Sequence, residues 1–336
     1  MKRFQALFGS PLVWTALWVV FLVAGGQRSP LAQTVEAGLT RVATVPGGGG
    51  GAAMAVDDGV LLVAQGTTLR VFDVSVPENS TVVGSFNLSQ PILGLTLEGD
   101  SAFVATSHDG LLRLDLSDPD SILVSGRMPT RGQAVGVARS GDAIYVADNS
   151  LGFDVVASDA ELVRVGEYLG EGFPRGIAAS GALVLVADQP AGLVVVDVSE
   201  RETPVVVGTL SLGNDPIQRV FVPPLESVAD SFAQRIVSIV SLRQGLQLVS
   251  AVDPGSPTIL SAIPTPEYPR AVAMWAASVF VASGELLEVW NISDPGVPVR
   301  VTTHDLGAVA TQITVNASLV FVATTNEVLI FQRSAR

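Results

Sequence analysis

The sequence is poor in the residues that carry most catalytic and metal chemistry. Its 336 residues include no cysteine, two histidines, three tyrosines and a single lysine, Lys2. Without cysteine there are no disulfides, no thiolate metal sites and no cysteine nucleophile. The two histidines, His108 and His304, fall in different repeats of the chain, so a zinc site with three histidine ligands is excluded.

Positive charge is also scarce. The formal net charge is −13 at pH 7, and the arginines that supply nearly all the positive charge form no basic stripe. Proteins that bind nucleic acid need clustered lysine or arginine to neutralise phosphates. The composition therefore argues against a nucleic-acid partner, and the acidic balance disfavours binding to anionic membranes.

Apolar residues are abundant, but they come in short runs. Hydrophobic residues make up 48% of the chain and charged ones 15%. After residue 24, no apolar run approaches the roughly 18 residues that a membrane-spanning helix needs. Runs such as Leu183–Ala187 and Leu193–Val196 are continuous rather than alternating, which is typical of strands buried on both faces.

The first 32 residues form a separate region. Lys2 and Arg3 precede an uncharged stretch, residues 4–27, that is most apolar at 12–24 and ends in small residues. This pattern is typical of a secretory signal peptide, with cleavage expected between Gly25 and Gln33. The alternative is an uncleaved membrane anchor, because residues 4–27 are long enough to span a bilayer with some mismatch. Both interpretations predict an exported protein in the periplasm, outside the cell or at its surface.

Two short sequence motifs recur along the rest of the chain. The first is an apolar strand that ends in Val-Ala and a polar residue, at 61–65, 102–106, 144–148, 184–188, 279–283 and 320–324, with a weaker copy at 238–242. The second is an apolar strand followed by a turn, at 69–77, 111–119, 193–201 and 287–295. Turns rich in Gly, Pro, Asp and Ser divide each unit into four strands. Four strands in about 40 residues make a unit the size of a propeller blade.

The repeats predict an all-β fold, a seven-bladed β-propeller of four-stranded antiparallel blades. The expected blades cover residues 52–89, 91–130, 133–170, 174–214, 217–265, 269–306, and 309–333 together with 38–46. The last unit has three strands of its own, and Leu39–Val45 resembles the fourth strands of other units. We therefore predict that this N-terminal strand pairs with the third strand of the last blade and removes an unpaired edge.

The second motif, which forms the third strand of each unit, and its flanking residues resemble a known repeat family. Gly192–Ser199 (GLVVVDVS), Tyr145–Asp148 (YVAD) and Ile292–Pro295 (ISDP) look like the LVIVD repeat, G-L-x-V-V-D-V-S-D-P-x-x-P preceded by a Y-V-A-D strand. The resemblance covers roughly residues 38–336 and is weakest in the fifth unit, where Ser250 replaces the strand-end aspartate. It implies a propeller, usually exported or at the cell surface, and it implies no common activity.

The sequence contains no motif for a hydrolase nucleophile, a zinc protease or a phosphate-binding loop, so we predict no catalytic, metal or cofactor site. The recurring Asp73, Asp115 and Asp197 are expected to cap turns by accepting backbone N–H bonds. His108 and Asp109 occur in one unit only. A His-Asp pair suits a general base or a metal ligand, and a solvated loop is the default interpretation.

Turns that join strands one to two and three to four lie on one face of a propeller, here called the first face. Connections between strands two and three, and between blades, lie on the second face. The first-face turns are acidic, with Arg139 and Arg201 as their only arginines. The Pro223–Gln234 insertion in the fifth unit is expected to be a surface loop on this face, with a binding role and a solvated excursion both open.

The second face supplies the candidate binding residues. Arg175 and Arg270 follow matching aromatic-proline pairs that begin at Phe173 and Tyr268. Arg131 lies at the connection between the second and third blades. Aromatic residues and arginine are enriched at interfaces. The competing interpretation is that a nearby acid, such as Glu171 or Glu267, pairs with each arginine and completes the rim of the channel.

These observations favour an exported, non-enzymatic binding or scaffold protein whose partner is a protein or a cell-surface component. An exported enzyme with an active site in the channel-side loops is one alternative. A membrane-anchored structural subunit of an envelope complex is another, with membrane contact only through residues 4–27 if these are not cleaved. An enzyme is disfavoured because propeller active sites gather several His, Asp or Tyr side chains, and this chain has only two histidines and three tyrosines.

Overall fold

The computed structural model describes residues 36–46, 53–150, 152–159, 161–224 and 236–335. The expected signal or anchor segment at residues 1–32, and residues 225–234 of the expected insertion, lie outside this part of the chain. Among the described residues, no helix has the length and apolar character needed to cross a membrane.

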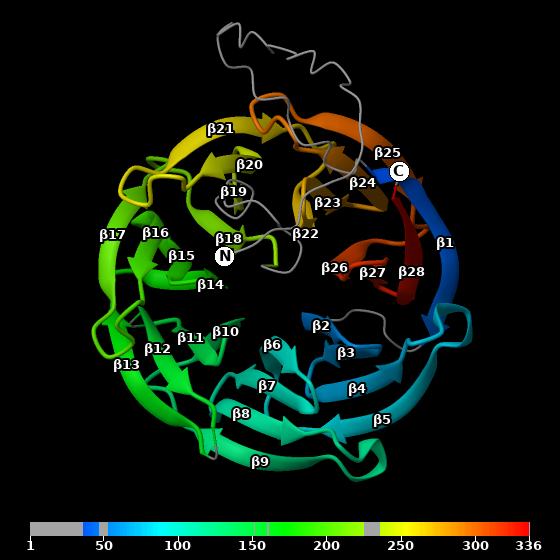
Figure 1. Cartoon of the computed structure of the whole chain (residues 1–336), viewed down its shortest axis with the longest axis horizontal. Helices are drawn as coiled ribbons and strands as arrows, with labels where there is room; N and C mark the ends of the chain where they lie inside the picture. Colours follow the sequence, from blue (N-terminus) through cyan, green and yellow to red (C-terminus); the bar gives the residue numbers. More distant parts are fainter. Residues whose placement is uncertain (1–35, 47–52, 151, 160, 225–235, 336) are drawn as a thin grey trace, which may run out of the picture. The chain divides into compact units, whose positions relative to one another are not determined.

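The described chain forms seven four-stranded antiparallel sheets arranged as a ring, as Figure 1 shows. Blade 1 contains β2 (Ala53–Asp57), β3 (Val60–Gln65), β4 (Thr68–Asp73) and β5 (Thr81–Asn87). Blade 2 contains β6 (Ile92–Glu98), β7 (Ser101–Thr106), β8 (Gly110–Asp115) and β9 (Leu123–Met128). Blade 3 contains β10 (Ala134–Ser140), β11 (Ala143–Asp148), β12 (Gly152–Ala157) and β13 (Val163–Leu169).

The remaining blades repeat this order. Blade 4 contains β14 (Phe173–Ser180), β15 (Leu183–Gln189), β16 (Gly192–Asp197) and β17 (Val205–Leu210). Blade 5 contains β18 (Ile217–Phe221), β19 (Ile236–Ser241), β20 (Gly245–Ser250) and β21 (Thr258–Ile263). Blade 6 contains β22 (Pro269–Trp275), β23 (Ser278–Ser283), β24 (Leu286–Asn291) and β25 (Val299–Asp305). Two short 3₁₀ helices, η1 (Pro77–Asn79) and η2 (Pro119–Ser121), lie in the turns before β5 and β9.

Blade 7 is built from both ends of the described chain. It contains β26 (Ala310–Val315), β27 (Leu319–Thr324), β28 (Glu327–Ala335) and, as its outer strand, β1 (Glu36–Pro46). β1 pairs antiparallel with β28, in a register that includes Leu39 opposite Arg333 and Val45 opposite Val328 (Figure 1). This confirms the prediction that the N-terminal strand closes the ring.

The core lies between neighbouring blades. One cluster joins Tyr145 and Phe153 of blade 3 to Val184 and Val196 of blade 4, all at most 2% exposed. Second and third strands are therefore covered on both faces, which explains their continuous apolar runs. Burial between blades replaces disulfides as the source of stability in this chain without cysteine.

The outer strands contact the next blade through glycines that the sequence analysis did not single out. A Cβ on Gly166 would lie 1.8 Å from the carbonyl oxygen of Arg201, and one on Gly208 would lie 2.0 Å from that of Pro254. At the equivalent position of blade 5, the Ser261 hydroxyl instead donates a hydrogen bond to the carbonyl oxygen of Pro295, at 2.6 Å. Close approach of backbones therefore joins each of these blades to the next.

Candidate functional site

The recurring aspartates are structural. Asp73, Asp115 and Asp197 each accept a hydrogen bond from the backbone N–H two residues later, at 2.9, 3.0 and 2.8 Å. Hydrogen bonds from the serine at that position lower the pKa of each carboxyl. The predicted role in turn capping is confirmed.

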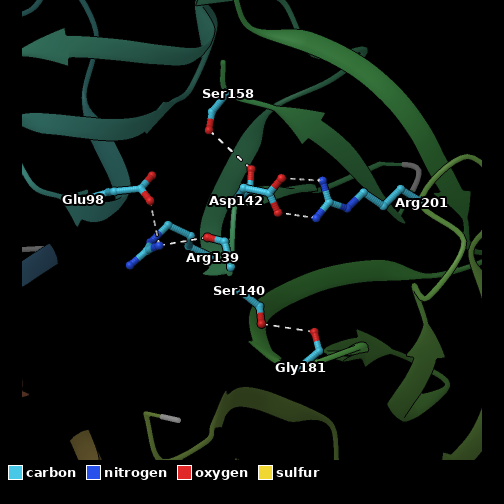
Figure 2. A network of polar contacts seen from close by, with 8 residues as sticks. Glu98, Arg139, Ser140, Asp142, Ser158, Gly181 and Arg201 are labelled. Carbon is cyan, nitrogen blue, oxygen red and sulfur yellow. Dashed lines mark hydrogen bonds and ion pairs between the residues drawn. The ribbon is translucent and has the colours of Figure 1, made fainter. Parts of the chain in front are cut away.

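On the first face, both predicted arginines form ion pairs, as Figure 2 shows. Arg139 pairs with Glu98 at 3.0 Å, which links blade 3 to blade 2. Arg201 binds both carboxylate oxygens of Asp142, which links blade 4 to blade 3. The hydrogen bonds from Arg201 lower the pKa of Asp142. These arginines therefore connect neighbouring blades.

A cavity of about 510 Å³ lies beside this network. It is lined by the first-face ends of the inner strands, including Arg139, Ile177 and Met274. Its walls mix apolar side chains with backbone, and its described lining includes no carboxylate. The cavity places no set of catalytic or metal-binding groups together.

His108 and Asp109 do not act as a pair. The Nδ1 atom of His108 lies 2.9 Å from the Ser107 hydroxyl. Asp109 accepts a hydrogen bond from the Ser89 hydroxyl at 3.1 Å and lies 4.0 Å from Arg127. No group of three or more His, Asp or Glu side chains within the described ranges is placed to hold a metal ion.

The three candidate arginines of the second face have different surroundings. Arg131 forms an ion pair with Glu167 of blade 3. Arg175 donates a hydrogen bond to the neutral side chain of Gln189, at 3.2 Å. Arg270 is exposed and makes no side-chain hydrogen bond or ion pair to any residue that the structure describes. Arg131 thus has an acidic partner, whereas Arg175 and Arg270 have none in the described chain.

The side chains of three arginines in the neighbouring blades 5 and 6 have no hydrogen-bond or ion partner among the described residues. Elsewhere in the described chain, arginine side chains form ion pairs or hydrogen bonds. Arg219, Arg243 and Arg270, all in blades 5 and 6, form neither with any described residue. Together with Arg175 of blade 4 they make up what we call the arginine patch. It lies on blades whose inner strands β14, β18 and β22 are neighbours in the ring (Figure 1).

A groove accompanies the arginine patch. It has a volume of about 620 Å³ and is lined by residues 242–245 and 262–269, at the boundary of blades 5 and 6. Leu242 and Tyr268 line it and are 54% and 41% exposed, and Phe173 of blade 4 is 53% exposed. Prolines at 264, 266 and 269 form part of its wall. We call it the blade 5–6 groove.

Arg219 and Asp188 are the two residues in this region that sequence reasoning missed. Arg219 lies inside β18 and is half-buried, and burial lowers the pKa of its guanidinium. Aligning the seven inner strands is the signal that would have found it, because this position is glycine or alanine in most blades.

Asp188 ends β15 with a side chain that is 1% exposed. Its counterpart in blade 3, Asp148, accepts hydrogen bonds from the N–H groups of Gly132 and Ser150. Residue 190 is proline and has no N–H to donate. No described group hydrogen-bonds the Asp188 carboxylate. The Ala191 amide lies near enough to lower the pKa of Asp188 slightly, but the effect of burial is larger. Burial therefore raises the pKa of Asp188.

Comparisons with known proteins agree with this architecture. The LVIVD repeat model matches residues 94–130, 131–157 and 171–211, which lie in blades 2, 3 and 4. No curated protein matches the chain by sequence.

Solved structures resemble the fold. The β-propeller domain of Myceliophteria thermophila Cps50 (Swd1) is 14% identical, with a TM-score of 0.69, over 88% of this chain and 99% of that one. The WD40 β-propeller domain of Doa1 is 13% identical, with a TM-score of 0.68, over 88% and 97%. The computationally designed Ika8 protein is 10% identical, with a TM-score of 0.61, over 87% and 99%. At these identities the likeness concerns the fold alone. The chain is therefore a seven-bladed β-propeller that carries LVIVD repeats.

Proposed function

We propose that this chain is an exported, non-enzymatic binding protein that holds a protein or cell-surface component against the second face of blades 4 to 6. The observation that carries the proposal is the arginine patch. In a chain with a net charge of −13, the three described arginine side chains without a hydrogen-bond or ion partner all lie in blades 5 and 6, the blades that border one groove. Acidic groups on a partner complete such a surface, because complementary charge steers encounter and fixes orientation.

The apolar residues of the same region support this interpretation. Phe173, Leu242 and Tyr268 are each more than two-fifths exposed. Interface cores are enriched in aromatic residues and arginine, and energy concentrates in a few such anchors. The prolines beside Phe173 and Tyr268 restrict the backbone, which lowers the entropy lost when a partner orders these side chains. The N-terminal basic-apolar-small pattern supports export.

The experiment is a comparison of two charge-matched double variants. Arg175→Ala with Arg270→Ala removes two arginines of the patch. Arg41→Ala with Arg127→Ala removes two exposed arginines elsewhere, with side chains 46% and 60% exposed. Each variant is used to capture cross-linked partners from the envelope fraction of the native host.

We expect the patch variant to lose a partner that the wild type and the control variant both capture at stoichiometric yield. Its melting temperature should equal that of the wild type, because Arg175 and Arg270 form no ion pair in the described chain. Equal capture by all three proteins would contradict the proposal. So would turnover of a substrate by the purified chain with no stoichiometric partner, which would favour the enzyme alternative.

A further inference from the structure

Arg219 occupies a position at which five of the seven blades have glycine or alanine. The position is the residue of each inner strand that pairs with Ala64, Ala105, Ala147, Ala187, Val240, Ala282 or Ala323 of the second strand. From blade 1 to blade 7 its occupants are Ala53, Gly94, Gly136, Gly176, Arg219, Ala271 and Gln312. An arginine is therefore no requirement of the repeat.

The small side chains are explained by the close approach of adjacent inner strands. A Cβ on Gly94 would lie 2.9 Å from the Cα of Gly136, and one on Gly176 would lie 3.3 Å from the Cα of Arg219. In each case the added atom meets the inner strand of the following blade. The corresponding direction at Arg219 is toward blade 6, where Tyr268 directly precedes β22, but β18 and β22 approach each other less closely than most neighbouring inner strands do.

The electrostatics agree with this placement. Burial raises the pKa of the Tyr268 hydroxyl, and the nearby charge of Arg219 offsets part of that rise. The charge of Asp215 adds to the rise in the pKa of Tyr268, but the Asp215 carboxylate is already engaged. It accepts hydrogen bonds from the Ser241 hydroxyl at 2.8 Å and from the amides of Arg243 and Gln244 at 2.8 and 2.9 Å.

The charge of Arg219 is thus left uncompensated. A guanidinium stays protonated in a protein, so it cannot escape burial by releasing its proton. A half-buried cation without a counter-ion is unfavourable. Arg219 has no hydrogen-bond or ion partner among the described residues.

We propose that the Arg219 guanidinium and the Tyr268 hydroxyl bind an oxyanion, a carboxylate or a phosphate, at the boundary of blades 5 and 6. The guanidinium fork donates two parallel N–H···O bonds to two oxygens of such a group, and the phenol supplies a third donor. Tyr268 also lines the blade 5–6 groove, which gives the anion its route from solvent. The inference rests on the proposed function, because it names the chemistry that a partner brings to the arginine patch.

The test titrates the full chain with sodium malonate and, separately, sodium phosphate, followed by calorimetry at constant ionic strength. We expect saturable binding of at least one anion to the wild type. Arg219→Met should weaken binding at least tenfold without lowering the melting temperature, because it removes an uncompensated charge and keeps an apolar stem. Arg219→Lys should retain part of the affinity, and Tyr268→Phe should weaken it less than Arg219→Met does.

The matched control is Arg127→Met, which removes the same charge from a side chain 60% exposed in blade 2 and should bind like the wild type. Preference for malonate identifies a carboxylate as the natural group, and preference for phosphate identifies a phosphoryl group. Unchanged affinity in Arg219→Met, or no saturable binding of either anion to the wild type, would overturn the inference. Partner capture by the wild type without anion binding would overturn the oxyanion site and leave the proposed docking surface standing.

Discussion

Removal of β1 should destabilise the whole ring. The perturbation is a variant that begins at Gly47, compared with one that begins at Thr34 and keeps β1. Leu39 and Val45 of β1 are 7% and 1% exposed. Full burial of one such side chain stabilises a fold by about 1.5–3 kcal/mol, so the loss is about 3–6 kcal/mol. Domains are stable by about 5–15 kcal/mol in total, which makes this a large fraction.

The assay is thermal and urea unfolding, followed by circular dichroism, with size-exclusion chromatography of both variants. At about 2 °C per kcal/mol, the melting temperature should fall by at least roughly 6 °C. Loss of β1 also exposes the edge of β28, so the shorter variant should self-associate. A synthetic peptide of residues 36–46 should restore part of the stability. Identical melting curves for the two variants would refute the closure argument.

Three further changes test the contacts between and within blades. Gly166→Ala places a Cβ against a backbone carbonyl and should lower the free energy of unfolding, measured in urea, by about 1–3 kcal/mol. Gly126→Ala should lower it less, because the new Cβ meets a movable side chain at 3.2 Å. Arg300→Met leaves Glu288, which is 0% exposed, without its ion partner. The free energy of unfolding in urea should fall by about 3 kcal/mol, which is more than we expect for Glu288→Gln. Burial raises the folded-state pKa of Asp188. Its contribution to stability therefore falls as pH rises above about 3.9, the value in unfolded chains. Asp188→Asn should raise the melting temperature at pH 7 and leave it unchanged at pH 3.

The architecture was predictable from the sequence because the same physical need recurs in every blade. Each second strand is buried on both faces, so each is a continuous apolar run, and each third strand ends in a turn that needs a cap. These two requirements repeat near every 40 residues and mark the blades. The ring closure followed from arithmetic, since the last unit lacked a fourth strand and Leu39–Val45 had no unit of its own.

Contacts that depend on the approach of neighbouring blades were not predictable in this way. Gly166 and Gly208 pack against carbonyl groups about 35 to 46 residues further along the chain. The local sequence around each glycine does not indicate which later residue it contacts. The acidic partner of Arg131 is Glu167 of the adjacent outer strand, and not Glu171 or Glu267 of the blade connections. The choice between several acids at similar sequence separation depends on side-chain geometry, which composition and spacing do not specify.

The ring also separates residues that serve the fold from residues that serve something else. Structural requirements repeat from blade to blade, so their residues recur: aspartates at several turns, and glycine or alanine at five of the seven positions where inner strands meet. Arg219 and Gln312 depart from the second pattern, and Arg219 brings a charge that no described residue compensates. Sequences depart from locally consistent choices mainly at functional sites, where stability is given up for another purpose. We therefore propose that the function of this chain lies at the boundary of blades 5 and 6, where the repeat is least regular.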